Sequence, residues 1–294
     1  MILLFAVDPN AAKALLQKGL LALQHGQLAE AQSALEQASR LGAENPYVWT
    51  SLAETYLREG DFDQAETAAA KAGHIGGTSP VVSHALSLFY FNDAQARLRK
   101  QDFTRAGEVL TTGLENDPRN VQLILALGVA RYGQRRFEEA IANFLRVIEL
   151  DPSFEQPYVF LGKMLDQAGA KLGEITKDYD AWNTQQPDNP QAPLVLAKAL
   201  LAADSHSARA ADLLKRSIAL EPNSWEAHYE LGVLLAGQHK YADAAAELKK
   251  SIDLNAKEAM PHYHLARVYD RLGDPEAAKA ERAIHQQLTG TGVQ

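Results

Sequence analysis

Residues that could perform hydrolytic chemistry stand together at one point of the chain. Asp204, Ser205, His206 and Ser207 supply a carboxylate, a hydroxyl nucleophile and an imidazole base within four positions. These groups form a catalytic triad only when they converge in space beside donors for the oxyanion, and adjacency in sequence does not achieve this. Because the four residues occupy a turn between two predicted helices, the pattern favours solvation and helix capping, and we expect no catalytic residue there.

Other candidates for chemistry are equally weak. His262 and His264 are two residues apart on a predicted helix and point to different sides, whereas two metal ligands on one face need a spacing of three, four or seven. The glycine-rich run at 73–78 ends a predicted helix instead of opening one, as a phosphate-binding loop would. The absence of cysteine excludes disulfides and thiol catalysis. We therefore expect a non-enzymatic protein with no catalytic residue, metal or cofactor.

The elements that would position any such groups repeat roughly every 34 residues. Apolar residues recur at helical spacing, and Gly and Pro interrupt them on schedule. A small residue returns once in the first and once in the second predicted helix of each unit, where two helices cross closely. In the first helix this place is held by Gly19, Ala53, Ala94, Gly128, Gly162, Ala197, Gly232 and Ala266. In the second helix it is held by Ala31, Ala65, Ala106, Ala140, Ile175, Ala210, Ala244 and Ala278.

These units resemble the tetratricopeptide repeat family. Residues 48–56, 158–165 and 228–235 match the first helix of that repeat, and residues 136–152 match the second helix and the proline that follows it. The resemblance implies an all-α fold, a right-handed α-solenoid of about eight helix–turn–helix repeats. Each helix pair would then be buried against the next, so that stability is close to a sum of local and nearest-neighbour terms.

The organisation expected from this pattern has three parts. A superhelix covers residues 12–288, an apolar tail precedes it at 1–11, and a frayed tail follows it at 289–294. The third unit is seven residues longer than the others, which predicts about two extra turns on its first helix.

Three residues depart from the repeat. Ile175 replaces the crossing alanine of the fifth unit, so this pair of helices should lie wider apart. Arg97 and Arg131 stand where the family usually has a half-buried Tyr or Leu. We expect their aliphatic stems to pack while the guanidinium groups reach water.

The resemblance also implies that the first helices line a concave groove and that a partner binds along one stripe of each. On this chain the stripe comprises Tyr47, Thr50, Glu54, Arg58, Phe91, Asn92, Gln95, Gln122, Leu125, Val129, Tyr132, Val159, Lys163, Leu194, Lys198, Tyr229, Tyr263 and Arg267. Two interpretations stay open. Curvature could bury the apolar members against neighbouring repeats, or the stripe could bind a peptide through its aromatic residues as anchors.

The second half of this stripe carries lysine side chains and is therefore more basic than the first half. Lys163 and Lys198 should form a basic pair able to hold a carboxylate or acidic segment, although ordinary solvated lysines would look the same. The carboxylate clamp that some family members use for chaperone C-termini is not reproduced, since the corresponding places of the first unit hold Leu16 and Leu20. A co-chaperone is therefore disfavoured.

The net charge and the terminal residues limit which classes of partner and which cellular compartments fit the sequence. The formal net charge of −8 argues against nucleic acid as a partner. The apolar residues 1–7 lack the basic lead of a secretory signal and are too short to span a membrane, so they either pack on the first repeat or remain from an export segment. The expected localisation is soluble and cytoplasmic, or periplasmic if such a segment was removed.

The function that these observations favour is an adaptor that binds a protein or peptide segment in the groove, and they also allow self-association. Two alternatives remain. One is a periplasmic or envelope-assembly factor that binds a nascent envelope component or a glycan, and the other is the recognition arm of a larger multidomain enzyme.

Overall fold

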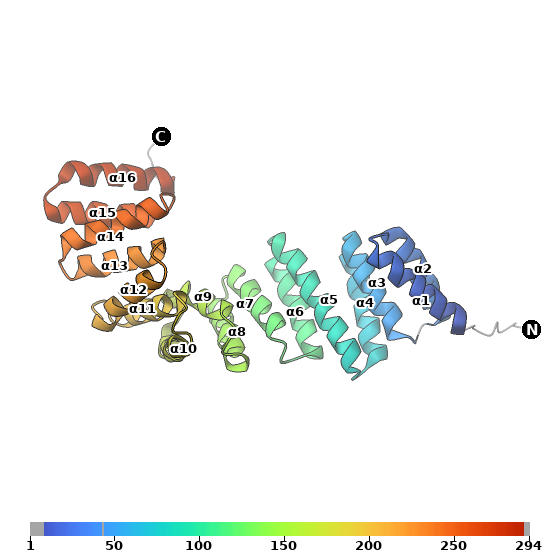
Figure 1. Cartoon of the computed structure of the whole chain (residues 1–294). Coiled ribbons are helices and arrows are strands. Elements are labelled where there is room, and N and C mark those ends of the chain that lie inside the picture. Colours follow the sequence, from blue (N-terminus) through green and yellow to red (C-terminus); the bar gives the residue numbers. More distant parts are fainter. Residues whose placement is uncertain (1–8, 43, 291–294) are drawn as a thin grey trace, which may run out of the picture. The chain divides into compact units, whose positions relative to one another are not determined.

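The computed structural model describes residues 9–42 and 44–290, and the expectations for residues 1–8 and 291–294 fall outside them. The described residues form helices joined by turns, with no strand among them (Figure 1). The chain divides into two compact units, which we call unit 1 (Met1–Leu150) and unit 2 (Asp151–Gln294). In the described part of the chain, no helix has both the length and the apolar character needed to cross a membrane.

Consecutive helices form eight pairs in the described residues, four in each unit. The helices of unit 1 are α1 (Pro9–Gln24), α2 (Leu28–Leu41), α3 (Pro46–Glu59), α4 (Phe62–Gly76), α5 (Pro80–Arg99), α6 (Phe103–Asn116), α7 (Val121–Gly133) and α8 (Phe137–Leu150). The α-helices of unit 2 are α9 (Gln156–Gly162), α10 (Leu172–Gln185), α11 (Gln191–Ala203), α12 (Ala208–Leu220), α13 (Trp225–Gly237), α14 (Tyr241–Leu254), α15 (Ala259–Leu272) and α16 (Pro275–Thr289). Two short 3-10 helices, Leu165–Gln167 and Gly169–Lys171, separate α9 from α10.

Local sequence determines where these helices begin and end. The Asn120 side chain accepts hydrogen bonds from the N–H groups of Gln122 and Leu123, and Asp274 accepts one from Ala277, so free N–H groups of the first turn are satisfied. In seven of the eight described pairs the turn places one residue in the left-handed region, seven positions after the small crossing residue, whereas Asp204 of the sixth pair is extended. Glycine fills this place at Gly26, Gly60, Gly169 and Gly273, while Gln101, Arg135 and His239 adopt a φ of 60 to 62° there.

Small residues permit close crossings within pairs such as α1–α2 and α7–α8, as the repeat predicts. A Cβ added to Gly128 would lie 2.6 Å from Phe144 Cε1, and one added to Gly19 would lie 2.5 Å from Leu35 Cγ. The crossing alanines of the second helices are fully buried, including Ala31 and Ala140. The all-α solenoid expected from the sequence is thus confirmed. The third pair carries the long helix α5, with 20 residues against 14 in α3 and 13 in α7.

The fifth pair differs from the expected first helix, which should have run through residues 158–165. Helix α9 ends at Gly162 after seven residues, and the Met164 N–H bonds the Leu161 carbonyl at 2.9 Å in a tighter turn. Bulky rings fill this interface, because Tyr158 stacks on Trp182 with centroids 4.3 Å apart. The short α9 is therefore a correction to the sequence interpretation, and we attribute it to these rings and to the fully buried Ile175.

Arg97 also differs from expectation, because its guanidinium does not reach water. The Arg97 side chain is only 9% exposed, and its Nε donates to Asp93 Oδ1 and its terminal nitrogen to Glu66 Oε1, both at 2.7 Å. Asp93 is fully buried, and burial raises the pKa of its carboxyl while Arg97 opposes the rise. Arg131 is less buried than Arg97, since its side chain is 18% exposed, and its guanidinium pairs with Glu139 at 3.3 Å.

Candidate functional site

The first helices of successive pairs contact one another, which places them on the inner side of each unit. In unit 1 these contacts join α1 to α3, α3 to α5 and α5 to α7, and in unit 2 they join α9 to α11 and α13 to α15. We call the exposed sides of α1, α3, α5 and α7 the unit 1 face, and those of α9, α11, α13 and α15 the unit 2 face. Each is described separately.

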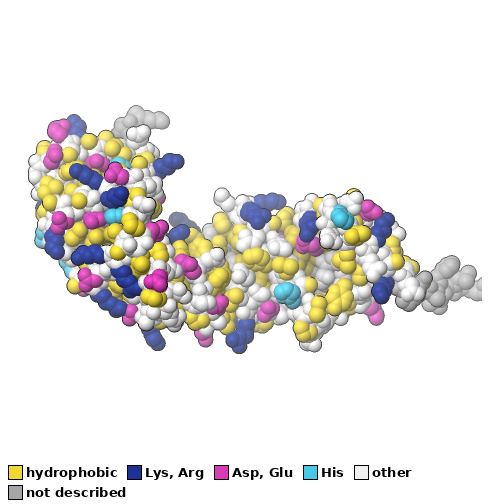
Figure 2. All heavy atoms as spheres, viewed as in Figure 1, with side chains coloured by type: hydrophobic (Ala, Val, Ile, Leu, Met, Phe, Trp, Pro, Cys, Tyr) yellow, Lys and Arg dark blue, Asp and Glu magenta, His cyan; other side chains and the backbone are white. Residues whose placement is uncertain are grey.

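The unit 1 face exposes aromatic rings. Tyr47 on α3 is 44% exposed and Tyr132 on α7 is 40% exposed, while Phe91 on α5 packs partly against the core. Leu125 is buried and belongs to the core. The remaining predicted residues are exposed (Arg58 and Gln122) or half-buried (Thr50, Glu54, Asn92, Gln95 and Val129). On the side in view, Figure 2 shows hydrophobic side chains gathered over unit 1 and charged side chains interspersed over α13 to α16.

Some polar residues of the unit 1 face are held within the protein. The Arg58 Nε donates to Glu54 Oε1 at 2.7 Å, and another Arg58 nitrogen donates to the Leu23 carbonyl at 3.2 Å. These contacts fix the guanidinium beside α1. Tyr47 and Tyr132 are therefore the aromatic residues of this face whose rings remain exposed.

The unit 2 face does not present the expected pair of free lysines. The Lys198 ammonium forms an ion pair with Glu226 on α13, whereas Lys163 is exposed and lies 6.0 Å from the centre of the Phe160 ring. Leu194 is buried and Val159 is half-buried. The positive charge of Lys198 is thus already balanced by a neighbouring repeat.

Glu230 lies one turn after Glu226 on α13 and is half-buried. Burial raises the pKa of its carboxyl to about 7, Lys198 opposes this, and Glu226 and Asp166 add to it. A carboxyl in this position changes its charge near neutral pH. The sequence interpretation did not single out Glu230, because the spacing within one repeat shows neither its burial nor its proximity to Lys198 and Asp166.

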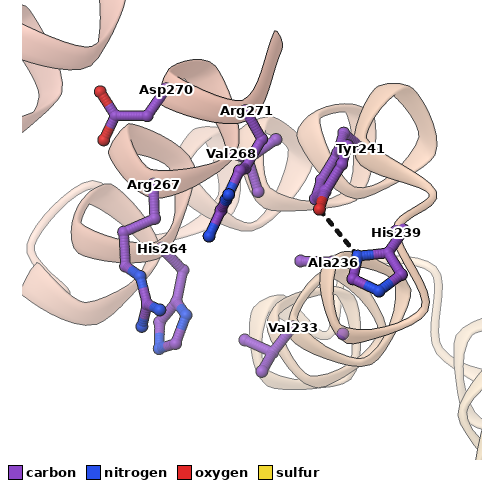
Figure 3. A pocket seen from close by; sticks show the side chains of 10 residues that line it. Val233, Ala236, His239, Tyr241, His264, Arg267, Val268, Asp270 and Arg271 are labelled. Carbon is purple, nitrogen blue, oxygen red and sulfur yellow. Dashed lines mark hydrogen bonds between the residues drawn. The ribbon is translucent and has the colours of Figure 1, made fainter.

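A cavity of about 470 Å³ lies between α13, the start of α14, and α15. Figure 3 shows the side chains of His264, Arg267 and Arg271 reaching toward one space, while Asp270 points away. The His239 Nδ1 and the Tyr241 hydroxyl are hydrogen-bonded at 2.8 Å on another side of the cavity. The full lining comprises Val233, Ala236, Gly237, His239, Tyr241, His264, Arg267, Val268, Asp270 and Arg271.

Aromatic contacts position the basic groups of this cavity. The Arg267 guanidinium lies 5.7 Å from the centre of the Tyr263 ring, which is 38% exposed. The His264 ring makes edge contacts with Tyr229 at 5.6 Å and with Tyr263 at 5.2 Å. Burial first and Arg267 second lower the pKa of His264, so its imidazole is neutral at pH 7.

Of the cavity residues, the sequence interpretation singled out Arg267 as a site residue but not His264 or Arg271. Their spacing of i, i+3 and i+7 is a single helical stripe and could have revealed them.

The residues that first suggested chemistry have structural roles. Ser205 Oγ and His206 Nδ1 are 3.0 Å apart in an exposed turn, where Asp204 accepts the His206 backbone N–H and Ser207 caps α12. His228 is buried and its Nδ1 lies 2.6 Å from a Glu247 carboxylate oxygen.

The same arrangement recurs one repeat later. His262 is buried, and its Nδ1 lies 2.6 Å from a Glu281 carboxylate oxygen. Both buried histidines thus join the two helices of a pair.

Known proteins resemble this chain in sequence and fold. The DnaJ homolog subfamily C member 7 homolog of Dictyostelium discoideum is 24% identical over 227 residues, which cover 66% of this chain and 42% of that protein. The Hsp70-Hsp90 organizing protein of Triticum aestivum is 25% identical over 204 residues, covering 67% and 34%. The chain thus spans between about a third and two fifths of the length of these curated relatives.

Two solved structures share the fold. PilW, a widely conserved type IV pilus biogenesis factor, has a TM-score of 0.59 at 20% identity, covering 70% of this chain and 94% of PilW. Yeast Tom70 has a TM-score of 0.53 at 18% identity, covering 98% of this chain and 62% of the Tom70 chain.

Family profiles described as tetratricopeptide repeat match most of the sequence. The matched segments are residues 22–87, 91–155, 125–190, 194–259 and 259–282. They run from the end of α1 to the middle of α16. The chain therefore belongs to the tetratricopeptide repeat family.

Proposed function

We propose that this protein is a non-enzymatic adaptor that holds a peptide or protein segment against the faces formed by its first helices. The observation that carries this proposal is the exposure of three tyrosines on first helices. Tyr47, Tyr132 and Tyr263 leave 44, 40 and 38% of their surface open, although neighbouring residues on the same helices are buried. Tyrosine is enriched among the anchors that dominate binding energy at protein interfaces.

The relatives agree with this role. One of them is named Hsp70-Hsp90 organizing protein. Membership of the tetratricopeptide repeat family supports an adaptor that works by protein contacts.

Affinity capture from the source cells with matched variants tests the proposal. The test protein carries Tyr47→Ala, Tyr132→Ala and Tyr263→Ala. The control carries Leu220→Ala, Ile284→Ala and Leu288→Ala, which remove similarly exposed apolar side chains from the second helices α12 and α16. Phe91 and Tyr229 are left unchanged because both pack partly against core residues, so their truncation would also weaken folding.

The expected result is a partner that the wild-type chain and the control retain and the tyrosine variant loses. Circular dichroism should show the same helix content in all three proteins. Equal recovery of the partner by the tyrosine variant would refute the proposal. Loss of the partner only in the control would also refute it and would place the binding surface on the second helices.

A further inference from the structure

The unit 2 cavity brings three side chains of one helix together. His264, Arg267 and Arg271 stand at i, i+3 and i+7 on α15, a spacing that puts them on one face. All three line the cavity and reach toward the same space, opposite α13 (Figure 3). Two guanidinium groups one turn apart repel each other, so this arrangement gains when an anion lies between them.

Positive charge in the cavity is not neutralised from within. Arg267 and Arg271 form no ion pair with any residue in the described part of the chain. Asp270 is the one acidic residue of the lining, and its carboxylate is paired with Arg282 on α16. A locally positive site in a chain of net charge −8 is complementary to a negative group on a partner.

The remaining lining is apolar and aromatic. Val233 and Ala236 contribute α13 to the cavity, and the hydrogen-bonded His239 and Tyr241 border another side. A volume of about 470 Å³ lies within the roughly 300 to 1,000 Å³ range of ligand sites. The space thus fits an anionic group together with an adjoining aliphatic side chain, which is a feature of peptides more than of free phosphate.

We propose that this cavity binds a carboxylate borne by an apolar peptide segment, with Arg267 and Arg271 holding the carboxylate and Val233 and Ala236 contacting the neighbouring aliphatic side chain. The proposal rests on the adaptor function and specifies the chemistry of the segment. The carboxylate can come from an Asp or Glu side chain or from a chain terminus. Planar guanidinium groups suit either source, because they present paired N–H donors to two carboxylate oxygens.

Titration of the full-length chain with small probes, followed by nuclear magnetic resonance of the Arg Nε–H and His ring signals, tests this proposal. The acidic probe is N-acetyl-leucyl-aspartyl-leucinamide, and its neutral counterpart replaces aspartyl by asparaginyl. N-acetyl-leucyl-leucine supplies a terminal carboxylate alone, and inorganic phosphate supplies an anion without a peptide. The protein variants are Arg267→Gln/Arg271→Gln and the charge-matched control Lys215→Gln/Lys257→Gln, whose lysines are exposed in unit 2 away from the cavity.

At least one carboxylate peptide should shift the Arg267, Arg271 and His264 signals saturably, with a dissociation constant of roughly millimolar size for so short a probe. Binding should weaken by about tenfold or more in the arginine variant, stay within about twofold in the lysine control, and weaken in about 0.5 M salt. The probe that binds more tightly identifies the source of the carboxylate.

Three results would overturn the assignment. The asparaginyl probe could bind as tightly as the carboxylate probes, phosphate could compete equally with them, or the arginine variant could keep full affinity. Failure here is distinguishable from failure of the adaptor function. If the arginine variant retains a captured partner that the tyrosine variant loses, the adaptor function is supported and the carboxylate site is refuted.

Discussion

Replacing Arg97 by Met should destabilise unit 1 strongly, because it leaves a buried carboxylate without its cation. Asp93 is fully buried and accepts the Arg97 Nε at 2.7 Å, while Glu66 binds the other side of the same guanidinium. Removing one partner of a buried ion pair costs about 3 to 5 kcal/mol. In a unit of this size that loss lowers the melting temperature by roughly 6 to 20 °C. Urea and thermal unfolding, followed by far-ultraviolet circular dichroism, measure both quantities.

The pH dependence of the same variant gives an independent check. Burial already raises the pKa of Asp93, and Arg97→Met removes the main opposing interaction, so the pKa rises further. A carboxyl whose pKa is higher in the folded state stabilises the fold at low pH and loses this contribution as pH rises through the folded value. The deficit should therefore shrink as pH falls toward about 4.

The double variant Asp93→Asn/Arg97→Met, which carries no buried charge at position 93, should recover at least half of the loss. A deficit for Arg97→Met below about 1 kcal/mol, the size typical of an exposed pair, would refute the reasoning. So would a deficit that does not change with pH.

Two further predictions concern packing and titration. Gly128→Ala should lower the free energy of unfolding in urea by about 1 to 3 kcal/mol, because the new Cβ would lie 2.6 Å from the Phe144 ring. The control Gly173→Ala should be neutral or stabilising, because nothing lies within 4 Å of its new Cβ. Equal effects of the two substitutions would contradict the close crossing. Because the pKa of Glu230 is raised, the stability of the wild type should fall by roughly 2 to 3 kcal/mol as pH rises from about 4.5 through about 7. Glu230→Gln should remove most of this fall. An unchanged slope of stability against pH would show that Glu230 is not its cause.

The fold was predictable because the repeat fixes the register locally. The same small residues that mark the period, such as Gly19, Gly128 and Ala140, are the ones that a close helix crossing requires, so sequence and packing contain the same information. The turns follow the same register. In every described pair but the sixth, the left-handed residue stands seven positions after the crossing residue, and even Gln101 and Arg135 adopt this conformation where glycine is missing.

What could not be predicted depends on contacts between repeats. The burial of Arg97 arises from Asp93 one turn earlier and from Glu66 on the preceding helix pair, and a single-repeat pattern does not show that both acids converge on one guanidinium. The stacking of Tyr158 on Trp182 joins the two helices of the fifth pair, and the spacing within one helix does not reveal it.

In the candidate site, too, the sequence predicted some features, while others depend on contacts between repeats. The stripe predicted the exposed Tyr47, Tyr132 and Tyr263, yet Leu125 and Leu194 on the same stripe are buried. Pairing of Lys198 with Glu226 on α13 likewise requires the neighbouring repeat, which no spacing within one unit reveals. Exposure and charge pairing along the stripe therefore had to come from the structure.

Site-specific photo-crosslinking is the measurement that tests the adaptor account most directly. An aromatic photo-crosslinker would replace Tyr47, Tyr132 or Tyr263 on the first helices, and in parallel Leu220 or Ile284 on the second helices, in chains exposed to the captured partner. The account predicts that the partner becomes attached through one or more of the tyrosine positions and not through the other two. Attachment only through Leu220 or Ile284 would contradict it.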